Sequence, residues 1–83
     1  MTIEDIKEIF ILPKMEEVGM FTGLHILSSK VNVQLLNDEQ YNLYYIASVD
    51  DILQSDLGID ELISVYNSGW VLDADNKFIR KTL

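Results

Sequence analysis

The sequence contains no cysteine among its 83 residues. A disulfide framework, a thiolate nucleophile and a cysteine-ligated zinc site are therefore excluded. No uninterrupted apolar run, Ile9–Leu12 included, approaches the length of a membrane span, and Met1–Asp5 carries acids where a secretory signal carries bases. We therefore expect a cytoplasmic protein that binds no membrane.

Basic residues are scarce and unevenly placed. Six Lys and Arg stand against fourteen Asp and Glu, which gives a formal net charge of −8, and the stretch 31–76 contains no Lys, Arg or His. That stretch holds nine carboxylates: Asp38, Glu39, Asp50, Asp51, Asp56, Asp60, Glu61, Asp73 and Asp75. An acidic surface repels phosphate backbones and attracts basic protein surfaces. We therefore expect no direct nucleic-acid binding and a basic protein partner, although acidity that only maintains solubility is an open alternative.

Groups for catalysis are also few. His25 is the only histidine, and no nearby residue supplies a nucleophile or a metal-ligand spacing. The sequence Asp73-x-Asp75-Asn76 resembles the start of a calcium loop, but the central glycine and the distal glutamate of such a loop are missing. We predict a solvated turn there, and a protein that is not an enzyme and has no metal or cofactor.

The amino-terminal segment has the pattern of a helix. Thr2 and Asp5 form a capping box, and the apolar residues from Ile3 to Phe10 recur at three- and four-residue spacing. Pro13 predicts that the helix ends near Ile11. A further helical turn is expected over Lys14–Val18.

Three following stretches read as an antiparallel meander. Met20–Leu27 is predicted as a strand, with a bulge or close approach at Gly23. Val31–Leu35 alternates apolar and polar residues, which predicts that the valines and Leu35 are buried. After a turn at 37–40, Tyr41–Ile46 has the aromatic and branched residues of a strand.

Two short helices and a hairpin complete the expected fold. Ser48 is placed to cap a helix through Leu57 that ends at a left-handed Gly58, and Asp60 to cap a second helix. Gly69 closes that second helix, and the stretches 70–72 and 77–79 flank a loop. With 48% hydrophobic residues, residues 1–83 are predicted to form one α+β domain with an N-terminal helix, a three-stranded antiparallel sheet, two short helices and a C-terminal hairpin or strand.

Two aromatic residues have expected roles, one in the core and one on the protein surface. Trp70 follows a helix-ending glycine and is expected to anchor the core. Tyr44 is expected on the exposed sheet face with Asn32, Gln34 and Asn42 around it. Tyrosine among amides is typical of a protein-binding surface, and equally of an ordinary exposed sheet.

Part of the chain resembles a known family. The run 62–70, Leu-Ile-Ser-Val-Tyr-Asn-Ser-Gly-Trp, and the sequence Asn37-Asp38 followed by Tyr45-Ile46 and Ser48 are similar to a small acidic anti-CRISPR protein of Gram-positive prophages. That family inhibits the RNA-guided CRISPR nuclease by occupying its basic DNA-reading groove as a DNA mimic. The resemblance implies partner contacts at Asn37, Asp38, Glu39, Asp73 and Asp75.

Two functional hypotheses follow. The first is a phage-encoded acidic inhibitor that blocks a basic nucleic-acid-binding surface of a host defence nuclease, acting in the host cytosol through Asn37, Asp38, Glu39, Tyr44, Asp73 and Asp75. The alternative is a small non-enzymatic phage or cytosolic structural or assembly protein that binds through its sheet face.

Overall fold

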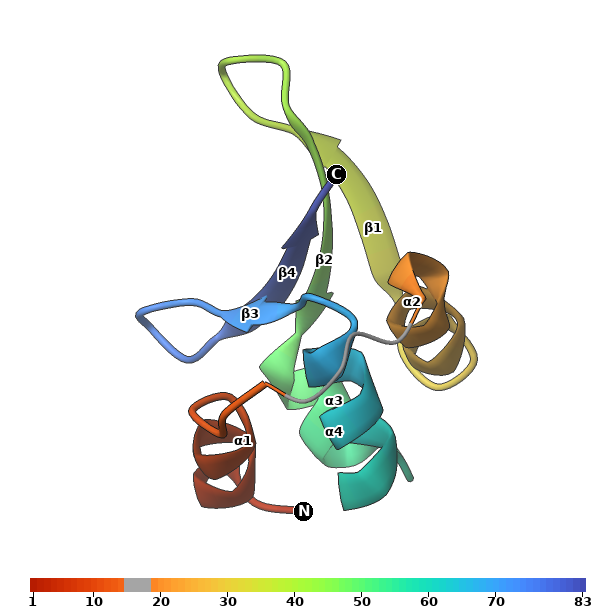
Figure 1. Ribbon diagram of the computed structural model, residues 1–83, viewed down its shortest axis with the longest axis vertical. Helices are drawn as coiled ribbons and strands as arrows, with labels where there is room; N and C mark the ends of the chain where they lie inside the picture. Colours follow the sequence, from red (N-terminus) through yellow and green to blue (C-terminus); the bar gives the residue numbers. More distant parts are fainter. Residues whose placement is uncertain (15–18) are drawn as a thin grey trace.

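Four helices and four strands make up the described part of the chain, residues 1–14 and 19–83 of a computed structural model (Figure 1). The helices are α1 (Ile3–Ile9), α2 (Met20–Ser28), α3 (Val49–Gln54) and α4 (Ile59–Asn67). The strands are β1 (Val33–Asn37), β2 (Leu43–Ser48), β3 (Val71–Leu72) and β4 (Phe78–Thr82). The predicted α+β class is confirmed. The helical turn expected over Lys14–Val18 lies largely outside the described residues.

The strands form one antiparallel sheet in the order β1-β2-β4-β3. The expected three-stranded sheet therefore differs from the structure, because β4 of the predicted C-terminal hairpin pairs with β2 and becomes a central strand. The hairpin itself is confirmed, with Val71 opposite Arg80 and Leu72 opposite Ile79.

The prediction of a strand over Met20–Leu27 is wrong, because these residues form α2. Leu24 and Leu27, three residues apart, share one face of a helix but would lie on opposite faces of a strand. Gly23 is explained by close packing. A Cβ atom at Gly23 would collide with Ser68 Oγ and come within 3.0 Å of Trp70 Nε1. The glycine thus lets α2 approach the end of α4.

Local capping chemistry sets the helix starts. The Asp5 N–H donates to Thr2 Oγ1 and the Thr2 N–H donates to Asp5 Oδ2, so the predicted capping box is confirmed. The Asp51 N–H donates to Ser48 Oγ, as expected for the start of α3.

The predicted junction between α3 and α4 is wrong in three details. The first helix ends at Gln54 and not at Leu57. Gly58 is extended (φ −85°) and is itself the N-cap of α4, so Asp60 is not the cap. The Gly58 N–H donates to Glu61 Oε1 at 3.0 Å, because a glutamate three residues into a helix can reach back to the cap.

The core lies between the helices and one face of the sheet. Trp70 is fully buried there, as predicted, beside the fully buried Ile6, Leu27 and Ile79. In Figure 1 the helices surround the lower part of the sheet, and the β1–β2 turn projects beyond them at the top. The prediction that Leu35 is buried is therefore wrong: its side chain is 51% exposed, because β1 extends past the helices that would cover it.

Among the described residues, no helix combines the length and apolar character that a membrane crossing requires.

Candidate protein-binding surface

One face of the sheet is left uncovered by the helices. The strand register places Ala47 and Ile79 side by side on the core face, where both are buried. Because side chains alternate along a strand, their neighbours point to the opposite face, here called the outer sheet face. It comprises nine exposed or half-buried residues: Gln34, Leu36, Tyr44, Ile46, Ser48, Val71, Phe78, Arg80 and Thr82.

The outer sheet face is mainly apolar and carries one charged group. Leu36, Val71 and Phe78 are 38%, 50% and 41% exposed, which leaves large apolar side chains open to water on three of the four strands. The Arg80 guanidinium lies 5.6 Å from the centre of the Tyr44 ring, a cation–π geometry. None of the nine residues bears a carboxylate.

The β1–β2 turn places the first group of predicted contacts. Asp38 organises it: Oδ1 accepts hydrogen bonds from the N–H groups of Gln40 (2.8 Å) and Asn42 (2.9 Å), and Oδ2 accepts from Asn42 Nδ2 (3.2 Å). The Asn42 N–H and then the other donors favour the ionised form, so the pKa of Asp38 lies below its ordinary value. Asn37 and Glu39 flank it and are exposed. A turn was expected at 37–40, and the structure has it one residue later: Asn37 still belongs to β1. Tyr41, expected to begin the next strand, lies in this turn.

The second group of predicted partner contacts, Asp73 and Asp75, lies in the β3–β4 turn. Asp73 Oδ1 accepts from the Lys77 N–H at 3.0 Å, and the Asp73 N–H donates to the Phe78 carbonyl. Asn76 adopts φ 58°, a left-handed conformation that asparagine tolerates. Asp75 is exposed at the tip. This is the turn predicted from the sequence.

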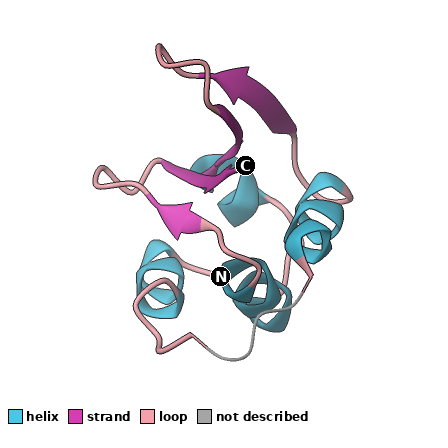
Figure 2. Ribbon diagram, turned by 45° about the horizontal axis from the view of Figure 1, so that its top comes forward, coloured by secondary structure: helices cyan, strands magenta, loops and turns pink. Residues whose placement is uncertain are grey.

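The two predicted groups are not brought together. Leu43 lies beside Leu83 and Ser48 beside Phe78, so the β1–β2 and β3–β4 turns lie at opposite ends of the β2–β4 ladder. At ~3.4 Å per residue this ladder is roughly 17 Å long. Figures 1 and 2 show the turns as two separate projections.

Tyr44 occupies the outer sheet face between these acidic ends. Of its expected neighbours Gln34 shares that face, but Asn42 precedes β2 and its amide binds Asp38 instead.

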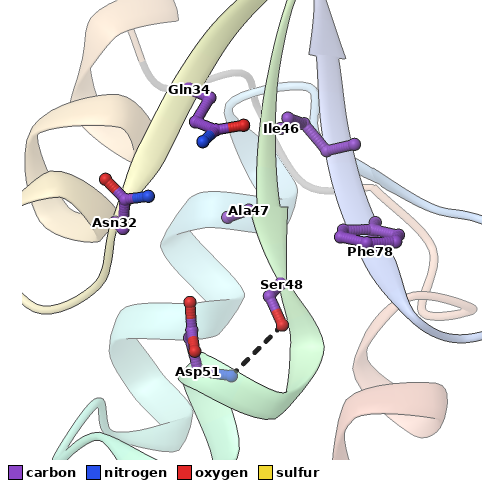
Figure 3. Close-up of a pocket in the computed structure, with 7 residues that line it drawn as sticks. All are labelled: Asn32, Gln34, Ile46, Ala47, Ser48, Asp51 and Phe78. Carbon is purple, nitrogen blue, oxygen red and sulfur yellow. Dashed lines mark hydrogen bonds between the residues drawn. The ribbon is translucent and has the colours of Figure 1, made fainter.

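A hollow of about 170 Å³ opens at one side of the outer sheet face. Figure 3 shows the Gln34 amide and the Ile46 and Phe78 side chains around it, with Asp51 below. The Ser48 hydroxyl accepts the Asp51 N–H, which fixes the start of α3 beneath the hollow. Ile46 and Phe78 give the hollow an apolar side, and Asn32, Gln34 and Asp51 give it polar groups. Such a lining suits a side chain that has an aliphatic stem and a cationic head.

Sequence reasoning missed three apolar residues on this face: Leu36, Val71 and Phe78. A signal was present in the C-terminal stretch, where Phe78 and Ile79 are adjacent. Two successive residues of a strand cannot face the same side, so one of the two had to point away from the core. Which one did so depended on the pairing with β2.

His25 lies exposed on α2 and not on the predicted strand. In the described part of the chain, no cluster of three or more histidine and carboxylate side chains could hold a metal ion.

Neither a protein-family model, nor a curated protein, nor a solved structure matches this chain.

Proposed function

We propose that this chain is a non-enzymatic cytosolic binding protein that docks its outer sheet face onto an apolar protein surface bordered by Lys and Arg. The observation that carries the proposal is the uncovered apolar face with acids at both ends. Binding through the sheet face comes from the second hypothesis that the sequence suggested, and the basic partner comes from the first.

The apolar centre supports a protein partner. An antiparallel sheet with one covered face normally presents polar residues to water on the other. Here Leu36, Ile46, Val71 and Phe78 stand together with the Tyr44–Arg80 pair. Aromatic residues and arginine are the side chains that interface centres favour.

The acids define the chemistry of the partner. Asp38 and Glu39 lie at one end of the face; Asp73, Asp75 and the start of α3 lie at the other. Charges at the rim act mainly on the rate of encounter and on specificity. The partner should therefore carry cations at the two ends of its contact surface and apolar residues between them. A second copy of this chain does not fit, because its own rim is acidic.

The hollow beside Phe78 supplies a more specific contact. A lysine or arginine of the partner entering it would lay its aliphatic stem against Ile46 and Phe78 and bring its charge to the Asp51 carboxylate. Such a contact is charge-assisted and partly desolvated, which makes it stronger than an exposed ion pair.

The test is affinity capture from lysate of the native cell with three purified baits: wild type, Phe78→Ser and Ile59→Ser. Phe78 and Ile59 are 41% and 47% exposed, but Ile59 begins α4 and lies off the outer sheet face. We expect one protein to be retained by wild type and Ile59→Ser and lost with Phe78→Ser. Its retention should decline with salt, since rim charges are screened.

Circular dichroism on both variants checks that they remain folded. Retention of every captured protein by Phe78→Ser, or equal loss with both variants, would contradict docking through this face.

A second candidate is the acidic inhibitor related to anti-CRISPR DNA mimics. Asp38 favours it, because three hydrogen bonds keep its carboxylate ionised and fixed on a projecting turn. If this candidate is correct, the captured protein is a phage-targeted host nuclease, and purified chain displaces its DNA. Asp38→Lys should then abolish displacement, whereas Phe78→Ser should leave it intact. The reverse pattern favours the sheet-face proposal.

A further inference from the structure

β1 is an edge strand without the usual protection. Among the described residues no strand pairs with its outer side. Its sequence, Val-Gln-Leu-Leu-Asn, has no charged residue and no proline, although natural edge strands commonly use such residues to prevent pairing. In Figure 1, α2 lies beside the start of β1, and the upper part of β1 projects clear of the helices.

The ladder fixes which backbone groups are free. The Asp38 N–H donates to the Asn42 carbonyl, and hydrogen bonding to the neighbour alternates along an antiparallel strand. The backbone groups of Gln34 and Leu36 therefore point to β2. Those of Val33, Leu35 and Asn37 point outward and can accept another strand.

We propose that β1 pairs antiparallel with β1 of a second copy, about a twofold axis at Leu35. This register uses every outward-pointing residue of the strand. Leu35 faces its own equivalent, and Val33 faces Asn37 of the other copy. The two sheets become one continuous eight-stranded sheet, and both outer sheet faces stay free, so the pairing is independent of the proposed docking function.

The side chains in this register are self-complementary. On the core side the two Leu35 side chains, each 51% exposed, lie side by side and cover one another. At the ends of the paired stretch, Val33 of each copy faces Asn37 of the other. All of the residues in β1 are uncharged, so the pairing brings no like charges together across the strands.

The absence of cysteine permits a direct test by single-cysteine cross-linking under oxidised glutathione. Facing Cα atoms of a hydrogen-bonded antiparallel pair are about 5.5 Å apart, within the range of a disulfide. Leu35→Cys should therefore give a covalent dimer. The control is Leu36→Cys: its equivalents would lie roughly 8 Å apart, beyond disulfide reach, on the other face. We expect Leu35→Cys to cross-link at least about tenfold faster. Equal rates, or no dimer from Leu35→Cys, would overturn the proposal.

Sedimentation of the unmodified protein provides a second readout. The mass should rise with concentration from 9.5 kDa to twice that value, and Leu35→Lys should keep it at the monomer value by opposing two ammonium groups across the axis. Because each copy carries a net charge of −8, added salt should strengthen the dimer, whereas it should weaken binding to a basic partner. A monomer at every concentration and salt level, or a dimer unaffected by Leu35→Lys, would exclude this pairing.

Discussion

The backbone N–H of Tyr41 donates a hydrogen bond of 3.0 Å to the carbonyl oxygen of Asp38. The bond closes the turn between β1 and β2 and accompanies a left-handed backbone at Tyr41, with φ 63°. The Tyr41 side chain is 87% exposed, so the fold gains little burial from it. An aromatic residue held in an unfavourable conformation without packing is a candidate contact for a partner.

Replacing Tyr41 should therefore stabilise the protein. Asparagine tolerates the left-handed region, so Tyr41→Asn should raise the free energy of unfolding by about 1 kcal/mol, measured by urea denaturation. Tyr41→Phe keeps the backbone cost and is the matched control, with unchanged stability. A less stable Tyr41→Asn protein would show that the ring supports the fold.

Asp38 should make stability depend on pH. Its pKa is lowered in the folded state by the Asn42 N–H and the other donors, so its contribution is complete above the ordinary aspartate pKa of 3.8 and is lost as pH falls through the lower, folded value. The melting temperature of Asp38→Asn should lie below that of wild type at neutral pH, and the two should converge in acid.

Glu39→Gln serves as the control in the same turn, because the three side-chain hydrogen bonds are accepted by Asp38 and not by Glu39. A gap between wild type and Asp38→Asn that stays constant down to the most acidic pH would argue against this role of the carboxylate.

Gly23→Ala should destabilise the protein, although alanine has a higher helix propensity than glycine. The gain in helix propensity is about 1 kcal/mol, but the new Cβ would meet Ser68 Oγ and the buried Trp70 indole, and overpacking of this kind costs about 1–3 kcal/mol. We expect a net loss in thermal unfolding. Thr22→Ala, an exposed change in the same helix, should cause no loss of thermal stability. Equal melting temperatures for the two variants would mean that α2 can move away from α4 at no cost, and would contradict close packing at Gly23.

Predictions from the sequence succeeded where neighbours along the chain decide the structure. Thr2 and Ser48 cap the starts of two helices, and Gly69, with φ 104°, follows the last residues of α4. These positions depend on contacts within a few residues, and they were predicted. Met20–Leu27 was misread because the role of Gly23 lies in packing against Trp70, distant in sequence. The central position of β4 was also missed, since pairing of Ile79 with Ala47 depends on the whole fold.

The candidate site shows the same division. Asp38, Glu39, Asp73 and Asp75 were correctly placed in turns, because turn residues have local signatures. Their separation to opposite ends of the sheet follows from strand order, which the sequence did not reveal. The apolar face between them was missed for the same reason: exposure of Phe78 follows from which side of β4 packs on the helices.

Docking through the outer sheet face is tested most directly by the dissociation constant of the isolated partner for wild type, Phe78→Ser and Ile59→Ser, measured by calorimetry at one salt concentration. Loss of a central aromatic contact should raise the constant for Phe78→Ser by about tenfold or more, while Ile59→Ser should stay within about twofold of wild type. Equal constants for Phe78→Ser and wild type would contradict the central claim.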